Sequence, residues 1–81
     1  MGSNVRIYSR PGCHLCELLI EEIAPLLRGK ATLEVLNIDS RADWKEAYDT
    51  RVPVVEFDGR FLCELTLDRA ALHKALSGTD Q

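Results

Sequence analysis

The sequence predicts an α/β fold with the element order β-α-β-α-β-β-α and a four-stranded mixed sheet flanked by helices. Near the N-terminus, a strand-like segment leads through a Pro-Gly turn into a helical pattern of leucines and then into a second strand-like segment. Further along, Asp58-Gly59 separates two more strand-like segments, which is a strong hairpin signal. The crossover helix makes the first strand pair parallel and the hairpin makes the last pair antiparallel, so the sheet is mixed.

The length and charge of the chain restrict what it can be. Its 81 residues predict one domain, residues 1–81, because a chain this short buries only about 60% of its unfolded surface and cannot build a second core. The formal charge of −3 creates no basic field for nucleic acid. The sequence lacks a run of about 18 apolar residues for a membrane span, and its start lacks a signal-peptide pattern. We therefore expect a cytoplasmic monomer without nucleic-acid or membrane partners.

The first half of the chain predicts a strand and a helix. Residues 5–9 alternate between apolar and polar side chains, as in a strand, and Pro11-Gly12 ends it. From His14 to the helix stop at Gly29, apolar side chains recur at helical spacing. Because proline removes a helical hydrogen bond, we expect a kink or a broken last turn at Pro25. The predicted apolar face consists of Leu15, Leu18, Leu19, Ile23, Leu26 and Leu27.

The middle of the chain predicts a second strand and a short helix. Residues 32–38 are β-branched and apolar, which favours a strand. Asp39-Ser40 follows at the position of a helix cap, and the helix is expected over residues 41–48. Trp44 and Tyr48 lie one turn apart in it, so we expect both rings to face the core.

The last part predicts the hairpin and the final helix. Residues 52–57 and 60–64 flank the Asp58-Gly59 turn and form the third and fourth strands. Asp68 caps the last helix, which Gly78 ends. The apolar side chains of this helix are Ala71, Leu72, Ala75 and Leu76.

Two cysteines, Cys13 and Cys16, lie at the start of the first predicted helix. The free amides and the dipole of a helix N-terminus stabilise negative charge, so Cys13 is predicted to ionise readily and act as the nucleophile. Cys16 follows one turn later, on nearly the same face and more buried, where it can reach the Cys13 sulfur. The two cysteines are therefore predicted to have different roles: Cys13 attacks a disulfide and Cys16 resolves the mixed disulfide.

Two charged neighbours of Cys13 leave alternatives open. Arg10 either adds positive charge that favours the thiolate or holds a substrate carboxylate, or it is a solvated charge at the end of a strand. His14 either tunes the thiol or simply faces water at the helix start.

A C-x-x-C pair is also half of many zinc sites. A structural zinc normally needs four ligands in two clusters. The remaining cysteine and both histidines are scattered and form no second pair, so no metal site is predicted; these residues are Cys63, His14 and His73.

The third cysteine makes the count odd, which excludes a fully paired disulfide framework within one chain. Cys63 is predicted to share one face of the fourth strand with Phe61 and Leu65. It is either a small buried hydrophobe or a third redox thiol close to Cys13.

Three segments together resemble the glutaredoxin-like branch of the thioredoxin superfamily: YSRPGCHLCE, RVPVVEFDGR and LDRAALHKAL. The resemblance implies a minimal thioredoxin/glutaredoxin fold and a small thiol-disulfide oxidoreductase with Cys13 and Cys16 as catalytic residues. It also implies a cis proline at Pro53, facing the cysteine pair. Arg10 matches a basic residue before the active site, and the Val52 backbone matches the group that pairs with glutathione or an extended peptide. The expected substrate-binding residues are Arg10, His14, Leu15, Val52 and Pro53.

One segment departs from the family pattern. Typical glutaredoxins follow the hairpin with a Gly-Gly pair and an acidic residue that help to hold glutathione, whereas this chain has Leu62-Cys63-Glu64-Leu65-Thr66-Leu67. The glycines that permit close backbone approach are missing, and Glu64 would repel a carboxylate. Thiol chemistry therefore carries over from the family better than glutathione specificity.

The resemblance also suggests partners and alternatives. We expect no tightly bound cofactor, a disulfide-containing protein or glutathione as substrate, and either glutathione or a partner reductase as electron donor. One alternative is a glutathione-assisted carrier of an iron-sulfur cluster or metal, shared through Cys13 across a dimer. Another is a non-catalytic module that binds a partner peptide along the edge at Val52.

Overall fold

The computed structural model describes residues 2–78, which form a four-stranded sheet with three helices. The strands are β1 (Ser3–Ser9), β2 (Ala31–Asn37), β3 (Val54–Phe57) and β4 (Arg60–Glu64). The helices are α1 (His14–Leu27), α2 (Ala42–Tyr48) and α3 (Arg69–Gly78), and a 3-10 turn, η1 (Ile38–Ser40), precedes α2. The predicted class and element order are confirmed. The predicted domain span also contains Met1 and residues 79–81, which lie outside the described part.

The sheet has the strand order β2-β1-β3-β4 and is mixed, as predicted. β1 and β2 run parallel, with Ser9 beside Asn37 at their carboxyl ends. β3 runs antiparallel to both β1 and β4, so Val54 lies beside Tyr8 on one side and Glu64 on the other. The carboxyl ends of β1, β2 and β4 and the start of β3 therefore meet at one end of the sheet.

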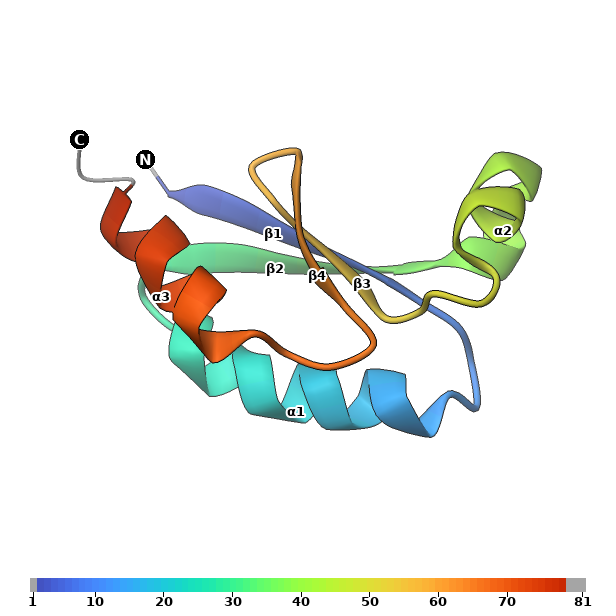
Figure 1. Ribbon diagram of the computed structural model, residues 1–81, viewed down its shortest axis with the longest axis horizontal. Coiled ribbons are helices and arrows are strands. Elements are labelled where there is room, and N and C mark those ends of the chain that lie inside the picture. Colours follow the sequence, from blue (N-terminus) through green and yellow to red (C-terminus); the bar gives the residue numbers. More distant parts are fainter. Residues whose placement is uncertain (1, 79–81) are drawn as a thin grey trace.

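Two groups of apolar side chains hold the fold together. α1 and α3 lie on the same side of the sheet, whereas α2 lies beyond one end of it (Figure 1). The main core fills the space between the sheet and α1 and α3, and its buried members are Val5, Ile7, Leu19, Ile23, Leu27, Val55, Phe57, Cys63 and Leu72.

The second group joins the sheet to α2. The Tyr8 ring stacks on the Tyr48 ring at a centroid distance of 4.4 Å and meets the Trp44 ring edge-on at 5.5 Å. Buried Ile38 and Val54 complete this small core. Trp44 and Tyr48 are thus turned toward a core, as predicted, but this core is separate from the main one.

Helix α1 buries a narrower face than the sequence predicts. Its buried residues are Cys16, Leu19, Ile23 and Leu27, whereas Leu15 and Leu18 remain 44% and 48% exposed. Each of these two leucines precedes a buried residue, and one helical step turns a side chain by about 100° away from the buried face. Leu15 and Leu18 therefore belong to the predicted apolar face but not to its buried part.

Proline does not break α1. The helix continues through Pro25 and ends at Leu27, so the expected broken last turn is absent. Pro25 has no amide hydrogen, so the last turn of α1 has one backbone hydrogen bond fewer. Gly29 then leaves the helix with φ of +77°, as expected of a glycine stop.

The start of α2 differs from the prediction. Asp39 and Ser40 form part of the 3-10 turn and do not cap the helix. Asn37 caps this turn instead, because its side-chain oxygen accepts a hydrogen bond from the Asp39 amide at 2.9 Å. Arg41 occupies the N-cap of α2 and makes no side-chain capping bond.

The hairpin between β3 and β4 forms at Asp58-Gly59, as predicted, with φ of 52° and 84° at the two residues. β4 also contains an irregularity. Glu56 pairs with Phe61 and Val55 pairs with Cys63, so Leu62 is an extra residue in β4. This bulge turns Cys63 into the core at 7% exposure and leaves Phe61 57% exposed. The prediction that Phe61 and Cys63 share one face is therefore wrong.

Candidate active site

A tight turn connects β1 to α1 and places Cys13. The Cys13 amide donates to the Arg10 carbonyl at 3.2 Å, and Gly12 has φ of +78°. Proline and then a residue with positive φ at the two central positions are the signature of a type II turn. The Pro11-Gly12 pair thus reverses the chain and delivers Cys13 to the N-cap of α1.

Cys13 caps the helix with its own sulfur. Its Sγ accepts a hydrogen bond from the Cys16 amide at 3.2 Å, and its carbonyl accepts one from the Glu17 amide at 3.1 Å. An amide that points at Sγ stabilises negative charge on that atom, as does the positive end of the helix dipole. Cys13 is also partly exposed, so a substrate can reach it.

Cys16 is the protected member of the pair. It is only 1% exposed, and it is a free thiol like Cys13. Burial raises the pKa of the Cys16 thiol, and the adjacent Cys13 raises it further. Hydrogen bonds from the Ser9 side chain and the Arg10 backbone oppose this rise in the pKa without cancelling it. Cys16 is therefore held as a neutral thiol behind the exposed Cys13.

Arg10 adopts an arrangement that neither sequence alternative describes. Its guanidinium Nη2 lies 2.6 Å from Asp49 Oδ1 and 3.3 Å from Asp39 Oδ1. Its Nη1 also donates to the Asp49 carbonyl at 3.5 Å. The charge of Arg10 is thus shared between two carboxylates of the protein itself, one from η1 and one from the C-cap of α2.

The two residues between the cysteines point outward. The His14 side chain is 80% exposed, and its Nδ1 lies 3.9 Å from a Glu17 carboxylate oxygen. Leu15 is 44% exposed on the first turn of α1. Both are accessible beside Cys13, where they can touch a bound molecule.

Val52 and Pro53 lie at the same end of the sheet as the cysteines. A cis peptide bond joins them, as the resemblance implies. The ladder between the antiparallel strands β1 and β3 ends with Tyr8 beside Val54. Pro53 and Val52, which precede Val54, therefore lie toward the end of β1 that leads into the cysteine loop. The carbonyl of buried Pro53 accepts a hydrogen bond from the Leu65 amide at 2.8 Å.

Cys63 is a buried member of the main core. Burial raises the pKa of the Cys63 thiol, as expected of a small buried hydrophobe. Within residues 2–78, no cluster of three or more cysteine, histidine or acidic side chains is placed to hold a metal ion. No helix of that same part is long and apolar enough to cross a membrane.

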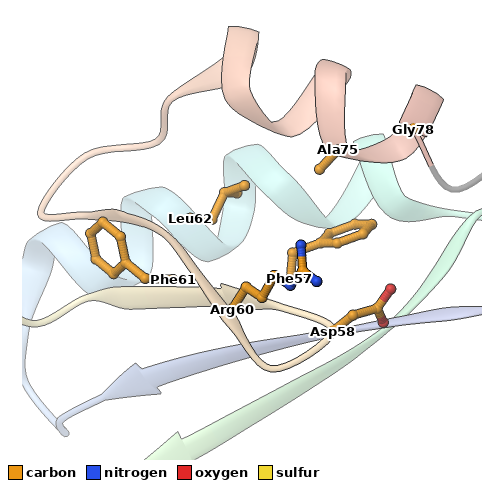
Figure 2. A pocket seen from close by; sticks show the side chains of 7 residues that line it. All are labelled: Phe57, Asp58, Arg60, Phe61, Leu62, Ala75 and Gly78. Atoms are coloured by element: carbon orange, nitrogen blue, oxygen red, sulfur yellow. The ribbon is translucent and has the colours of Figure 1, made fainter.

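Two cavities lie at different ends of the sheet. One, of about 490 Å³, lies between the β3-β4 hairpin and α3, where Asp58 and Arg60 flank apolar Phe57, Leu62 and Ala75 (Figure 2). The other, of about 300 Å³, borders the cysteine loop and is lined by residues 9–12, Glu17 and residues 35–37. The second cavity is therefore the one that lies beside the turn leading to Cys13.

The model of the Glutaredoxin-like domain family (DUF836) matches residues 4–77. The chain belongs to this family. Protein Ne2328 of Nitrosomonas europaea is 32% identical, with 91% of each chain covered and a TM-score of 0.81. Protein XcR50 of X. campestris is 33% identical, with 91% of this chain and 96% of that chain covered and a TM-score of 0.71.

The wider fold of this glutaredoxin-like domain extends to a known glutaredoxin. Glutaredoxin C1 of Populus tremula x tremuloides shares the fold at 20% identity, with 91% of this chain and 83% of that chain covered and a TM-score of 0.65. No curated protein gives a significant match. A glutaredoxin-like thioredoxin fold that carries the Cys13-Cys16 pair indicates redox capability.

Sequence reasoning missed three residues that shape the site of this glutaredoxin-like domain. Ser9, which is 8% exposed, hydrogen-bonds to Cys16, and Asp39 and Asp49 hold Arg10. Asp39 could have been found, because it follows the end of a strand parallel to the one that Arg10 follows. Asp49 is distant in sequence, and no pattern marks it as a partner of Arg10.

Proposed function

We propose that this protein is a thiol-disulfide oxidoreductase with Cys13 as nucleophile and Cys16 as resolving thiol. The observation that carries the proposal is the hydrogen bond of 3.2 Å from the Cys16 amide to the Cys13 sulfur. This amide points at the accessible sulfur and can stabilise negative charge on it, while Cys16 is 1% exposed beside it. A bulky disulfide can thus meet Cys13 and cannot meet Cys16.

The exchange runs in two balanced steps. The Cys13 thiolate attacks one sulfur of the substrate disulfide, forms a mixed disulfide and expels the other sulfur as a thiolate. Cys16 then gives its proton to solvent or to the expelled thiolate and attacks the Cys13 sulfur, which releases the second substrate thiol. The substrate gains two electrons, and the protein is left with a Cys13-Cys16 disulfide. A thiol donor, either glutathione or the dithiol of a reductase, returns the pair to its reduced form.

The order of the steps is supported by the burial and the protonation of Cys16. The raised pKa of Cys16 keeps it neutral while Cys13 attacks, so the two sulfurs do not compete for the first step. Once the mixed disulfide forms, Cys16 is one turn from the sulfur that it must reach. The pair needs a reducing compartment such as the cytoplasm to work as a reductant.

Val52 and Leu15 supply the surface on which a substrate chain would lie. Val52 lies two residues before Val54, the first paired residue of β3, so its peptide group can pair with an extended segment in the manner of strand addition. Leu15 is exposed next to Cys13 and offers an apolar contact. A protein disulfide in an extended segment therefore suits this site.

Trapping of the mixed disulfide tests the proposal. Cys16→Ser, incubated with a disulfide-containing protein, is expected to form a stable 1:1 adduct through Cys13, visible by intact mass. The wild type should pass to an internal disulfide, and Cys13→Ser should give no adduct. Cys63→Ala is the matched control, because it removes a thiol from the core and should react like the wild type.

The opposite result would be equally clear. If Cys13→Ser retained the reductase activity of the wild type, or if both thiols stayed reduced against every disulfide, the oxidoreductase proposal would be wrong.

A further inference from the structure

The charged groups around Cys13 are already paired with one another. We call the redox end the part of the surface formed by residues 9–17, 37–40, 49–53 and 64–65, which meet at the carboxyl end of β1. A ligand with carboxylates would need a free cation or free helix amides there.

Arg10 is the first candidate and is fully engaged. Its guanidinium contacts Asp49 at 2.6 Å and Asp39 at 3.3 Å, and its side chain is 28% exposed. The single positive charge of Arg10 is therefore outnumbered by the two negative charges of its carboxylate partners. Glu17, which lines the cavity beside the cysteine loop together with Arg10, adds a further negative charge. A carboxylate that entered this cavity would meet net negative charge.

Arg51, on the other side of the redox end, is engaged in the same way. Its Nε and Nη2 both lie 2.9 Å from Glu64 Oε1. Its guanidinium also lies over the Tyr48 ring at 5.6 Å and the Phe61 ring at 5.8 Å, which fixes its position. Glu64 belongs to the segment where typical glutaredoxins have glycines. The segment that departs from the glutaredoxin pattern thus supplies the carboxylate that pairs with Arg51.

At the N-terminus of α3, an acidic side chain of the protein already takes one of the helix amides. The Asp68 side chain accepts a hydrogen bond from the Ala71 amide at 3.0 Å. The Asp68 carboxylate thus occupies the position where an external carboxylate would bind. In the described part of the chain, the two guanidinium groups at the redox end contact three carboxylates, those of Asp39, Asp49 and Glu64. A fourth carboxylate, Glu17, lies beside His14.

We propose that the redox end discriminates by charge, so that Cys13 reacts with neutral or cationic disulfides in preference to anionic ones. The preferred substrate is then a polypeptide disulfide with uncharged or basic neighbours, and glutathione, which carries more carboxylates than amines, is a poor partner. This inference rests on the proposed oxidoreductase function and adds the substrate class to it. Its physical basis is Coulomb repulsion between a ligand carboxylate and Asp39, Asp49 and Glu17, which salt screens.

Three small disulfides of different charge test the inference. The reduced protein is mixed with cystamine, which is cationic, with hydroxyethyl disulfide, which is neutral, and with oxidised glutathione, which is anionic. Oxidation of the Cys13-Cys16 pair is followed by acid quench and intact mass. Each rate constant is divided by the rate constant of the same probe with 2-mercaptoethanol, which removes differences in intrinsic reactivity.

We expect the normalised rate for cystamine to exceed that for oxidised glutathione by about tenfold at low salt, with the neutral probe between them. Raising the ionic strength to about 1 M should reduce this ratio to about twofold, because the screening length falls to about 3 Å. The salt series needs no variant, so it cannot fail through misfolding.

The double variant Asp39→Asn/Asp49→Asn then locates the effect. It frees Arg10 to meet a carboxylate, so the normalised rate with oxidised glutathione should rise by about tenfold at low salt. Glu34→Gln is the matched control. Glu34 also pairs with a single arginine, Arg6, at 3.1 Å, but it lies in the middle of β2, and its loss should leave the cystamine-to-glutathione ratio within about twofold.

The outcomes separate the two proposals. Equal normalised rates for all three probes, or a ratio that salt does not change, would overturn the charge inference and leave the oxidoreductase function intact. An equal response of Glu34→Gln and the double variant would also overturn it, because the effect would then be one of net charge. A protein that reacts with none of the probes would overturn the proposed function and the inference together.

Discussion

The guanidinium of Arg10 lies 2.6 Å from the carboxylate of Asp49 and thereby ties the end of β1 to the C-cap of α2. This link matters because α2 has few other anchors. The helix has only seven residues, none of them buried, and its N-cap makes no side-chain bond. Its position depends on the Arg10 ion pairs and on the packing of Trp44 and Tyr48 against Tyr8.

Replacement of Arg10 is therefore expected to destabilise the fold. Arg10→Gln should lower the midpoint of urea unfolding, because it leaves Asp39 and Asp49 without their shared cation. Arg6→Gln is the control, since within residues 2–78 Arg6 pairs with one carboxylate, that of Glu34. The midpoint shift should be roughly twice as large for Arg10→Gln and should shrink in high salt. Equal shifts would show that the second carboxylate contributes nothing.

The buried thiols predict a loss of stability at alkaline pH. Burial raises the pKa of Cys16 and of Cys63 above the ordinary value of 9.0. The unfolded chain therefore loses these protons first as the pH rises through that value, and the free energy of unfolding falls until the folded thiols ionise as well. The slope can reach about 1.4 kcal/mol per pH unit for each thiol.

Urea unfolding at several pH values from about 8 to about 10.5 measures this slope. Cys63→Ala should give a shallower slope than the wild type, even though the cavity lowers its stability at every pH. The same slope in both proteins would mean that Cys63 does not contribute.

The turn before Cys13 requires its glycine. Gly12→Ala places a side chain at φ of +78° and should cost about 1–2 kcal/mol of unfolding free energy. No neighbouring atom lies within 4 Å of the added Cβ, so the cost comes from the backbone alone. Gly78→Ala is the control, because Gly78 is helical and its added Cβ also meets open space; it should be neutral or slightly stabilising. A neutral Gly12→Ala would show that the turn adapts.

The two faces of α1 predict a sharp contrast between neighbours. Leu19 is 1% exposed and Leu18 is 48% exposed. Leu19→Ala should lower the free energy of unfolding by about 2–5 kcal/mol, the range for a buried leucine. Leu18→Ala should change it by less than about 0.5 kcal/mol. Similar losses from both variants, measured by urea unfolding, would contradict the assigned face.

Local signals in the sequence predict the framework well. Asp58-Gly59 takes up positive φ at both positions, as a two-residue hairpin demands. Pro11-Gly12 marks the turn that sets Cys13 at a helix start, and the C-x-x-C spacing places Cys16 one turn further on. These features depend on residues within a few positions of one another, so the sequence alone contains them.

Features that depend on distant residues were missed. The extra residue Leu62 reverses the orientation of Phe61 relative to Cys63, and no sequence pattern marks it. The pairing of Arg10 with Asp39 and Asp49 joins residues that only the tertiary fold brings together. The sequence predicts the positive charge of Arg10 near Cys13, but not the two carboxylates that compensate it. This compensation is the reason why we propose neutral or cationic disulfides as substrates.

One sulfur atom would serve both the helix and the proposed redox couple. The Cys13 sulfur that caps α1 is the atom that would enter a disulfide with Cys16, and a disulfide sulfur carries no charge for the helix amides to stabilise. Oxidation would therefore weaken the first turn of α1, and the intact turn would favour the reduced pair. The stability of this helix end would thus contribute to the reduction potential of the Cys13-Cys16 pair. About 1.4 kcal/mol of capping free energy corresponds to about 30 mV of reduction potential.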